Sequence, residues 1–331
     1  MTERLKILHC ANFSHRKSGA AYYATDRKIS NGFTRNGHMV VDFSYRDMAR
    51  AYSPLKIKAL GIKKMNQLLV TTVERMRPDV LVLGHTELVA NATLRKIRAT
   101  HPDIKIVMWF VDWIRKIKAN QHFFSQRVAL LDALFTSTDA ALIQSIFTDS
   151  SQHAKIHFLP NICDSSIDTG RAFEQLRPRH DIVFVGRYDG HRNALIRLLR
   201  KGLPGFNIGL YGQSAYSLLF GHDYIKVLAA STMAINYSRD NEISLYSSDR
   251  IVHLTANGCL TFSPQPPNMQ TIFSDEEVVY FSDMGDLKEK LLYYAAHPRE
   301  AALIAEAGHK RAHKDYESGV VTRQILAALN S

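Results

Sequence analysis

The sequence predicts an α/β protein built from two domains, each with a parallel β-sheet. Short apolar runs rich in β-branched and aromatic residues alternate with helical patterns along the whole chain. The alternation stops at a polar stretch, residues 164–180, and then starts again. Near-continuous apolar strands separated by helices are typical of parallel sheets covered on both faces. A chain of 331 residues is long enough for two such cores, and we expect both domains to be Rossmann-like.

The predicted elements fall into two series. In the first half, strands are predicted at 5–13, 39–45, 79–85, 104–112 and 133–138, and helices at 20–35 and 91–99. In the second half, strands are predicted at 181–187, 206–212, 231–238, 259–264 and 278–283, and helices at 193–201, 224–230, 249–257, 287–296, 301–313 and 322–329. Gly258 suits the position after a helix end. We place the domains at 1–162 and 163–316, followed by a terminal helical segment at 317–331.

Composition limits the class of protein. The chain is 46% hydrophobic and 22% charged, as is typical of soluble globular proteins. Its cysteines, Cys10, Cys163 and Cys259, form no disulfide or zinc motif, which favours a reducing, cytoplasmic location. No apolar run approaches the roughly 20 residues that span a bilayer. The charged start of the chain does not resemble a signal peptide.

The formal net charge of +11 predicts an affinity for anions. Basic residues cluster at 56–64, 115–118, 192–201 and 309–314. Phosphorylated sugars, acidic lipid headgroups and nucleic acids are candidate partners, and a merely solvated basic surface is the plain alternative. No nucleic-acid-binding motif accompanies the charge, so we do not expect a nucleic-acid partner.

The turn after the first predicted strand is a candidate ligand contact. Ser18 and Gly19 lie before the following helix, where a glycine lets a ligand approach the backbone. The turn lacks a GxGxxG fingerprint, which argues against a dinucleotide. An ordinary strand-to-helix turn is the alternative. His15 is a candidate catalytic base or acceptor contact at the same edge.

Two further strands of the first half end in polar residues. Asp112 comes at the end of the run 104–112, between Trp109 and Trp113, whose rings suit a sugar. Asp112 is a candidate base for an acceptor hydroxyl, or alternatively the N-cap of a helix that starts at Trp113. His85 and Glu87 come after the strand at 79–84, and Glu87 is a second candidate base.

Anion-binding candidates follow the strands of the second half. Gly186 and Arg187 come at the C-terminal end of the strand at 181–187, where an arginine suits a diphosphate. Tyr211 and Gln213 come after the next strand and suit a nucleobase.

A segment before the helix at 249–257 adds hydroxyls and charge. Ser247, Ser248 and Arg250 form a candidate anion site at the helix start, with simple N-capping by Ser248 or Asp249 as the alternative. His253 lies one turn further on. No Asp-x-Asp pair, hydrolase elbow or P-loop is present, so we expect no metal and no bound cofactor.

A series of short motifs runs from 231 to 316: Ala234–Asn236, Ser247–Arg250, Leu254–Gly258, Ile272–Asp275, Val279–Asp283, Asp286–Leu287 and Ile304–Arg311. In these motifs the chain resembles bacterial glycosyltransferases related to the spore-maturation protein CgeB, and the resemblance is strongest in this region. It extends more loosely to Arg77–Val80, His101–Asp103, Trp109–Asp112 and Leu159–Asn161.

This resemblance implies a GT-B fold, a nucleotide-sugar donor and a last helix that returns to the first domain. Relatives carry a glutamate where this chain has His253, which leaves the donor open. We expect transfer of a sugar to a surface glycan or glycolipid, docking of the enzyme on an anionic membrane surface, and donor contacts from the second-half candidates. A non-catalytic glycan- or nucleotide-binding protein is the alternative.

Overall fold

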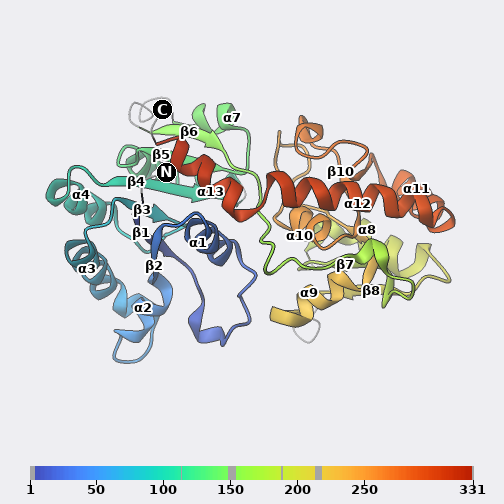
Figure 1. Cartoon of the computed structure of the whole chain (residues 1–331), viewed down its shortest axis with the longest axis horizontal. Coiled ribbons are helices and arrows are strands. Elements are labelled where there is room, and N and C mark those ends of the chain that lie inside the picture. Colours follow the sequence, from blue (N-terminus) through green and yellow to red (C-terminus); the bar gives the residue numbers. More distant parts are fainter. Residues whose placement is uncertain (1–3, 113, 148–153, 188, 213–217, 330–331) are drawn as a thin grey trace. The chain divides into compact units, whose positions relative to one another are not determined.

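The computed structural model describes residues 4–112, 114–147, 154–187, 189–212 and 218–329. The chain divides into two units, which we call unit 1 (Met1–Leu159 with Ser318–Ser331) and unit 2 (Pro160–Glu317) (Figure 1). Unit 1 contains a six-stranded sheet and unit 2 a five-stranded sheet, and every strand pair is parallel. The predicted class, two Rossmann-like α/β domains, is confirmed. The domain limits predicted from the sequence lie after residues 162 and 316, close to those of the two units.

Unit 1 has its sheet in the order β2-β1-β3-β4-β5-β6. The strands are β1 (Lys6–Ala11), β2 (Met39–Ser44), β3 (Val80–Leu83), β4 (Lys105–Phe110), β5 (Ala133–Thr136) and β6 (Lys155–Phe158). The helices are α1 (Thr25–Arg35), α2 (Tyr45–Ala51), α3 (Lys58–Met76), α4 (Asn91–Thr100), α5 (Arg115–Ala119), α6 (Gln121–Val128) and α7 (Ala140–Gln144), with a 3-10 turn at His15–Lys17. The order reverses between β1 and β3, which makes their carboxyl ends the switch point where such sheets bind ligands.

Unit 2 repeats this plan with the order β11-β10-β9-β7-β8. The strands are β7 (His180–Val185), β8 (Ile208–Tyr211), β9 (Ser231–Ile235), β10 (Leu260–Pro264) and β11 (Val279–Phe281). The helices are α8 (Asn193–Arg197), α9 (Gly221–Ala229), α10 (Arg250–Ala256), α11 (Met284–Ala296) and α12 (Pro298–Asp315), with a π-helical turn at Leu198–Gly202 and 3-10 turns at Ala172–Glu174, Gly190–Arg192 and Met269–Thr271. Here the switch point lies between β7 and β9.

The last helix, α13 (Ser318–Ala327), belongs to unit 1 and packs on α1. Gly32 makes the close approach possible, because a Cβ there would lie 2.3 Å from the Ser318 carbonyl oxygen. Hydrogen bonds from Arg35 to Ser318 Oγ and from Asn36 to Gly319 O, both 2.8 Å, fix the contact.

Some elements differ from the prediction. Helix α1 begins at Thr25 rather than at 20, because Ser18 and Gly19 have left-handed backbone angles (φ 49° and 85°) that interrupt a helix. The helix predicted at 193–201 is divided into α8 and the π-helical turn. Helices α2, α3, α5, α6 and α7 and strand β6 were not among the predicted elements. Among the described residues, no helix combines the length and the apolar character that crossing a membrane requires.

Candidate functional site

Two arginines converge at the switch point of unit 2. Arg250, the first residue of α10, donates hydrogen bonds from Nε to Val185 O (2.7 Å) and from Nη1 to Tyr237 O (3.2 Å). Arg192 donates to the same Tyr237 carbonyl at 3.2 and 3.0 Å. Both guanidinium groups lie near the ring of Phe184, Arg250 at 5.3 Å and Arg192 at 5.7 Å from its centroid. The carboxyl ends of β7 and β9 thus hold two cations side by side.

The positive charge at this point exceeds the negative charge. Burial, together with repulsion from Arg250, lowers the pKa of Arg192 to about 10, and burial also lowers the pKa of Arg250. An arginine with such a pKa is still charged at neutral pH. Asp189 is a carboxylate beside them, with its Oδ2 3.2 Å from Arg192 Nη1. Asp249 also acts on Arg250. A buried arginine beside a half-buried one favours binding of an anion.

Gly186 makes room for Arg250. A Cβ at Gly186 would lie 2.8 Å from Cζ of Phe184 and 3.1 Å from Nη2 of Arg250. The next residue, Arg187, is exposed at the same end of β7. Of the predicted donor residues, Gly186, Arg187 and Arg250 therefore lie together.

The serines before α10 hold this segment in place. The Ser247 side chain is buried, and its Oγ accepts a hydrogen bond from Asn236 Nδ2 at 3.1 Å and donates to Ser248 O at 3.1 Å. Asn161 Nδ2 donates to the Ser247 carbonyl at 3.2 Å. Ser248 Oγ accepts a bond from the Arg250 N–H at 3.3 Å. Both predicted serines are thus engaged in positioning Arg250.

The remaining predicted donor residues either lie away from the arginine pair or fall outside the described residues. The Tyr211 hydroxyl is 2.8 Å from His180 Nε2 at the start of β7, so its ring runs back along the sheet, away from the carboxyl edge where we expected it. His253 is 2% exposed and packs 5.6 Å from the Tyr224 ring. Gln213 lies outside the described residues.

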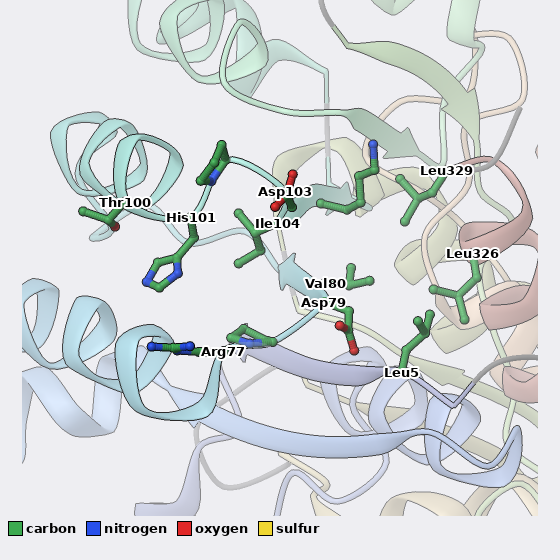
Figure 2. A pocket seen from close by; sticks show the side chains of 13 residues that line it. Leu5, Arg77, Asp79, Val80, Thr100, His101, Asp103, Ile104, Leu326 and Leu329 are labelled. Atoms are coloured by element: carbon green, nitrogen blue, oxygen red, sulfur yellow. The ribbon is translucent and has the colours of Figure 1, made fainter.

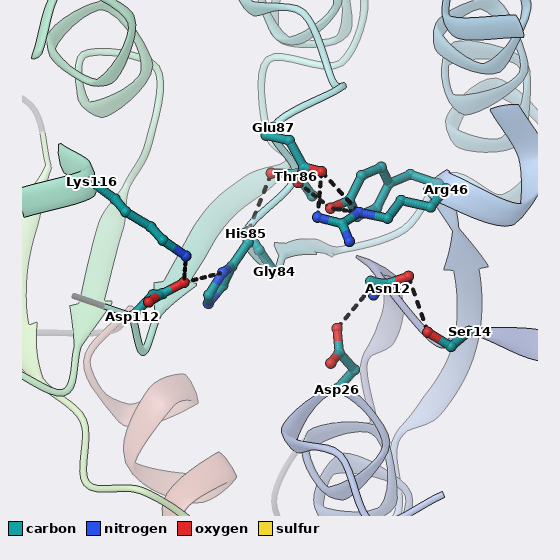
Figure 3. Close-up of polar contacts among 11 residues, drawn as sticks. Asn12, Ser14, Asp26, Arg46, Gly84, His85, Thr86, Glu87, Asp112 and Lys116 are labelled. Atoms are coloured by element: carbon teal, nitrogen blue, oxygen red, sulfur yellow. Dashed lines mark hydrogen bonds and ion pairs between the residues drawn. The ribbon is translucent and has the colours of Figure 1, made fainter. Parts of the chain in front are cut away.

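At the switch point of unit 1, Glu87 is held by two partners (Figure 3). Its carboxylate accepts a hydrogen bond from the Tyr45 hydroxyl and one from Arg46 Nε at 2.8 Å, and it pairs with Arg46 Nη2 at 2.5 Å. Burial raises the pKa of Glu87, but the hydrogen bonds and the Arg46 charge outweigh it, so the pKa is lowered overall. Glu87 is therefore a weak proton acceptor with both oxygens engaged.

His85 and Asp112 form a second polar group at the ends of β3 and β4 (Figure 3). Asp112 Oδ2 is 4.0 Å from His85 Nδ1 and pairs with Lys116 Nζ. Burial lowers the pKa of His85, despite the nearby Asp112 charge, so the ring is neutral at pH 7. The helix that follows begins at Arg115 with Ile114 as its cap, so the alternative of Asp112 as N-cap is wrong.

The other predicted residues of unit 1 are dispersed. His15, Ser18 and Gly19 are exposed on the connection from β1 to α1. The expectation that the Trp109 ring faces a sugar is wrong, because the ring is 3% exposed and its Nε1 donates to His9 Nε2 at 3.1 Å inside the core. Trp113 lies outside the described residues.

Several residues at these edges escaped prediction. They are Arg192 and Asn236 in unit 2 and Asp26, Tyr45 and Arg46 in unit 1. Asp26 is at this edge because its Oδ1 accepts a hydrogen bond from the Asn12 N–H at 2.8 Å. Arg192 was counted only within a surface basic cluster, although it is 5% exposed. Its position in the turn after the Gly186 strand was the available signal. No group of three or more His, Cys, Asp or Glu side chains among the described residues is arranged to hold a metal ion.

Two open cavities lie away from the predicted side chains. One, of about 630 Å³, lies at the amino ends of β3 and β4 in unit 1, between Arg77, His101 and Asp103 on one side and Leu326 and Leu329 on the other (Figure 2). This is the edge opposite the switch point. The other, of about 890 Å³, lies in unit 2 beside Pro264 and Phe281, and Tyr237 lines it. Tyr237 thus adjoins both this cavity and the arginine pair.

Comparison with known proteins relates both the sequence and the fold to sugar transfer. Residues 187–327 match a family model described as "Glycosyl transferase-like". No curated protein sequence matches the chain.

Solved structures match over the whole chain. A sucrose-phosphate synthase from Thermosynechococcus elongatus has a TM-score of 0.69 at 12% identity, over 98% of each chain. An alpha-glucosyltransferase in complex with UDP and a 13-mer DNA has 0.68 at 11%, over 99% of this chain and 100% of that one. Anabaena HepE in complex with UDP-glucose has 0.58 at 14%, over 99% and 100%. The fold is GT-B, and the family match together with the fold supports a glycosyltransferase.

Proposed function

We propose that the chain transfers a sugar from a nucleotide-sugar donor, anchored in unit 2, to a hydroxyl group of a glycan or glycolipid. The observation that carries this proposal is the convergence of Arg192 and Arg250 on the Tyr237 carbonyl. Their excess positive charge lies at a switch point, where parallel sheets bind ligands. The family match, residues 187–327, includes both arginines.

The donor phosphates are proposed to lie against Arg187 and Arg250. Guanidinium groups bind phosphate oxygens through charge-assisted hydrogen bonds and stabilise the charge that develops on a departing nucleotide. Protein cations would then take the part that a metal plays in enzymes with an Asp-x-Asp pair, which this sequence lacks. Two of the similar structures contain UDP or UDP-glucose, so a uridine nucleotide is the first donor to test.

The reaction breaks the bond between the anomeric carbon and the donor phosphate oxygen. The nucleotide leaves with that electron pair, and the acceptor oxygen forms the new bond to the anomeric carbon. The acceptor proton passes to a carboxylate. We take Asp112, which pairs with Lys116, as the first candidate for that role, because hydrogen bonds and the Arg46 charge lower the pKa of Glu87 and make it a weaker proton acceptor. A carboxylate in this role contributes about 10²- to 10⁴-fold in rate.

The test is donor binding by the Arg250→Ala variant. Calorimetry with UDP, GDP, CMP and dTDP identifies the nucleotide, and its Kd is then measured for the variant. Removing a charge-assisted bond costs about 1.5–3 kcal/mol, so we expect Kd to rise roughly 10- to 100-fold. Arg197→Ala is the matched control, because Arg197 is exposed on α8 in the same unit. Equal affinities for wild type and Arg250→Ala would refute the donor site.

A nucleotide sugar that binds without turnover would instead favour a non-catalytic binding protein. The discriminating measurement is release of nucleotide from the bound nucleotide sugar. We expect slow release without acceptor and faster release with it.

A further inference from the structure

A surface in unit 1 exposes apolar side chains among lysines. Between the end of α2 and the second turn of α3, four side chains are exposed by 48% to 70%: Tyr52, Leu55, Ile57 and Leu60. Lys56, Lys58, Lys63 and Lys64 alternate with them or follow directly. We call residues 52–64 the α2–α3 surface. Figure 1 shows this connection at the lower left of unit 1.

All the charged residues of the α2–α3 surface are lysines. No Asp or Glu occurs between Asp47 and Glu74. Asp47 itself is engaged elsewhere, because it accepts bonds from the His15 N–H (2.8 Å) and from Ser44 Oγ (2.6 Å). The lysines are therefore not neutralised by acidic neighbours in the sequence.

The fold holds the apolar side chains outward. Helices α2 and α3 touch at Gly61, where a Cβ would lie 1.7 Å from the Ala49 carbonyl oxygen. The inner face of α3 is filled by buried Met65 and Leu69, which leaves Leu60 and Lys64 on the outer face. The Ser53 hydroxyl accepts a bond from the Ile57 N–H at 3.1 Å and closes the turn. Tyr52, Leu55 and Ile57 thus lie on the connection between two packed helices, and Leu60 lies on the first turn of α3.

We propose that the α2–α3 surface binds an anionic lipid bilayer, with Leu55, Ile57 and Leu60 entering the headgroup region and the lysines contacting lipid phosphates. Apolar side chains combined with lysines are what interfacial binding to anionic lipid requires. Lysine is depleted from protein–protein interfaces, which disfavours a protein partner. Nucleic acid would bind the lysines through its phosphates, but this binding would not involve the three exposed aliphatic side chains.

This surface lies close to the acceptor-side residues. Helix α2 runs from Tyr45, whose hydroxyl binds Glu87, to Ala51, one residue before the surface begins. Seven helical residues span about 10 Å. A bilayer bound there would bring a lipid-linked acceptor near Glu87 and Asp112. This identification of the acceptor as lipid-linked rests on the proposed function, whereas the binding of the bilayer does not.

The experiment is flotation of the full chain with vesicles of phosphatidylcholine alone or with one-third phosphatidylglycerol. We expect binding only to the anionic vesicles, weakened by salt. Each lysine near an anionic surface contributes on the order of 1 kcal/mol, so Lys56→Gln/Lys63→Gln/Lys64→Gln should weaken partition roughly 100-fold. Leu55→Gln/Ile57→Gln/Leu60→Gln should weaken it at least roughly tenfold.

Matched controls carry the same changes on unit 2. Lys201→Gln/Lys226→Gln/Lys288→Gln removes equal charge, and Leu176→Gln/Leu292→Gln/Leu303→Gln removes three exposed aliphatic side chains. Equal binding by each surface variant and its control would overturn the proposal, as would preferential binding to DNA of equal charge. All variants should keep the melting temperature and nucleotide Kd of the wild type. A failure of Arg250→Ala to alter nucleotide binding would refute the donor site and leave the vesicle result standing.

Discussion

At the scale of single residues, burial of charge gives the molecule its pH dependence. Asp26 has its pKa raised to about 6, because burial outweighs the hydrogen bond from Asn12 and the charges of Arg46 and Arg27. Its ordinary pKa is 3.8. Between pH 3.8 and about pH 6, Asp26 is therefore protonated in the folded protein and ionised in the unfolded chain. Folding stability falls as the pH rises through this range.

We expect Asp26→Asn to remove this pH dependence. The amide oxygen can still accept the Asn12 N–H bond, but no charge is buried. Relative to wild type, the variant should gain stability at about pH 7.5 and little at about pH 4. Denaturant unfolding followed by tryptophan fluorescence reports on unit 1, because both tryptophans belong to it. The same stability difference at both pH values would contradict the burial of charge at Asp26.

Asp112 can be separated from the donor site by its effect on kinetics. Asp112→Asn keeps the size of the side chain but removes the proton acceptor, so kcat for transfer should fall about 10²- to 10⁴-fold. The nucleotide Kd should stay unchanged, because Arg250 lies in the other unit. Both parameters are measured on the same preparation. A normal kcat would exclude Asp112 as the base and return attention to His15 and Glu87.

At the scale of elements, the contact of α13 with α1 depends on Gly32, which has no side chain. We expect Gly32→Ala to destabilise unit 1 by about 1–3 kcal/mol, because the new methyl group meets the Ser318 backbone at 2.3 Å. Thermal unfolding of the variant measures this loss. Gly190→Ala is the control, since a Cβ there meets no atom within 4 Å. An unchanged melting temperature for Gly32→Ala would mean that α13 is not packed on α1 as described.

Strands were easier to predict from the sequence than side-chain positions. The buried strands around Leu81, Ile106 and Val183 are near-continuous apolar runs, so their periodicity identifies a parallel sheet without tertiary information. The site depends on contacts between distant segments. Arg250 was identifiable as the charged residue at a helix start. Arg192 comes near it only in the folded chain, where both contact the Tyr237 carbonyl and the Phe184 ring. We predicted an exposed Trp109 ring because it precedes Asp112, but the sequence does not reveal which face of the strand is buried, and Trp109 is on a buried face.

At the scale of the whole molecule, we propose that unit 2 anchors the donor and that unit 1 docks on the membrane and accepts the proton. The most direct test of the donor site is hydrogen–deuterium exchange of the full chain with and without saturating nucleotide. We predict slower exchange in peptides that cover 185–192 and 236–256, around Arg192 and Arg250, and unchanged exchange in peptides that line the cavity at Arg77 and His101. Protection confined to that cavity, with none around Arg250, would contradict the central claim.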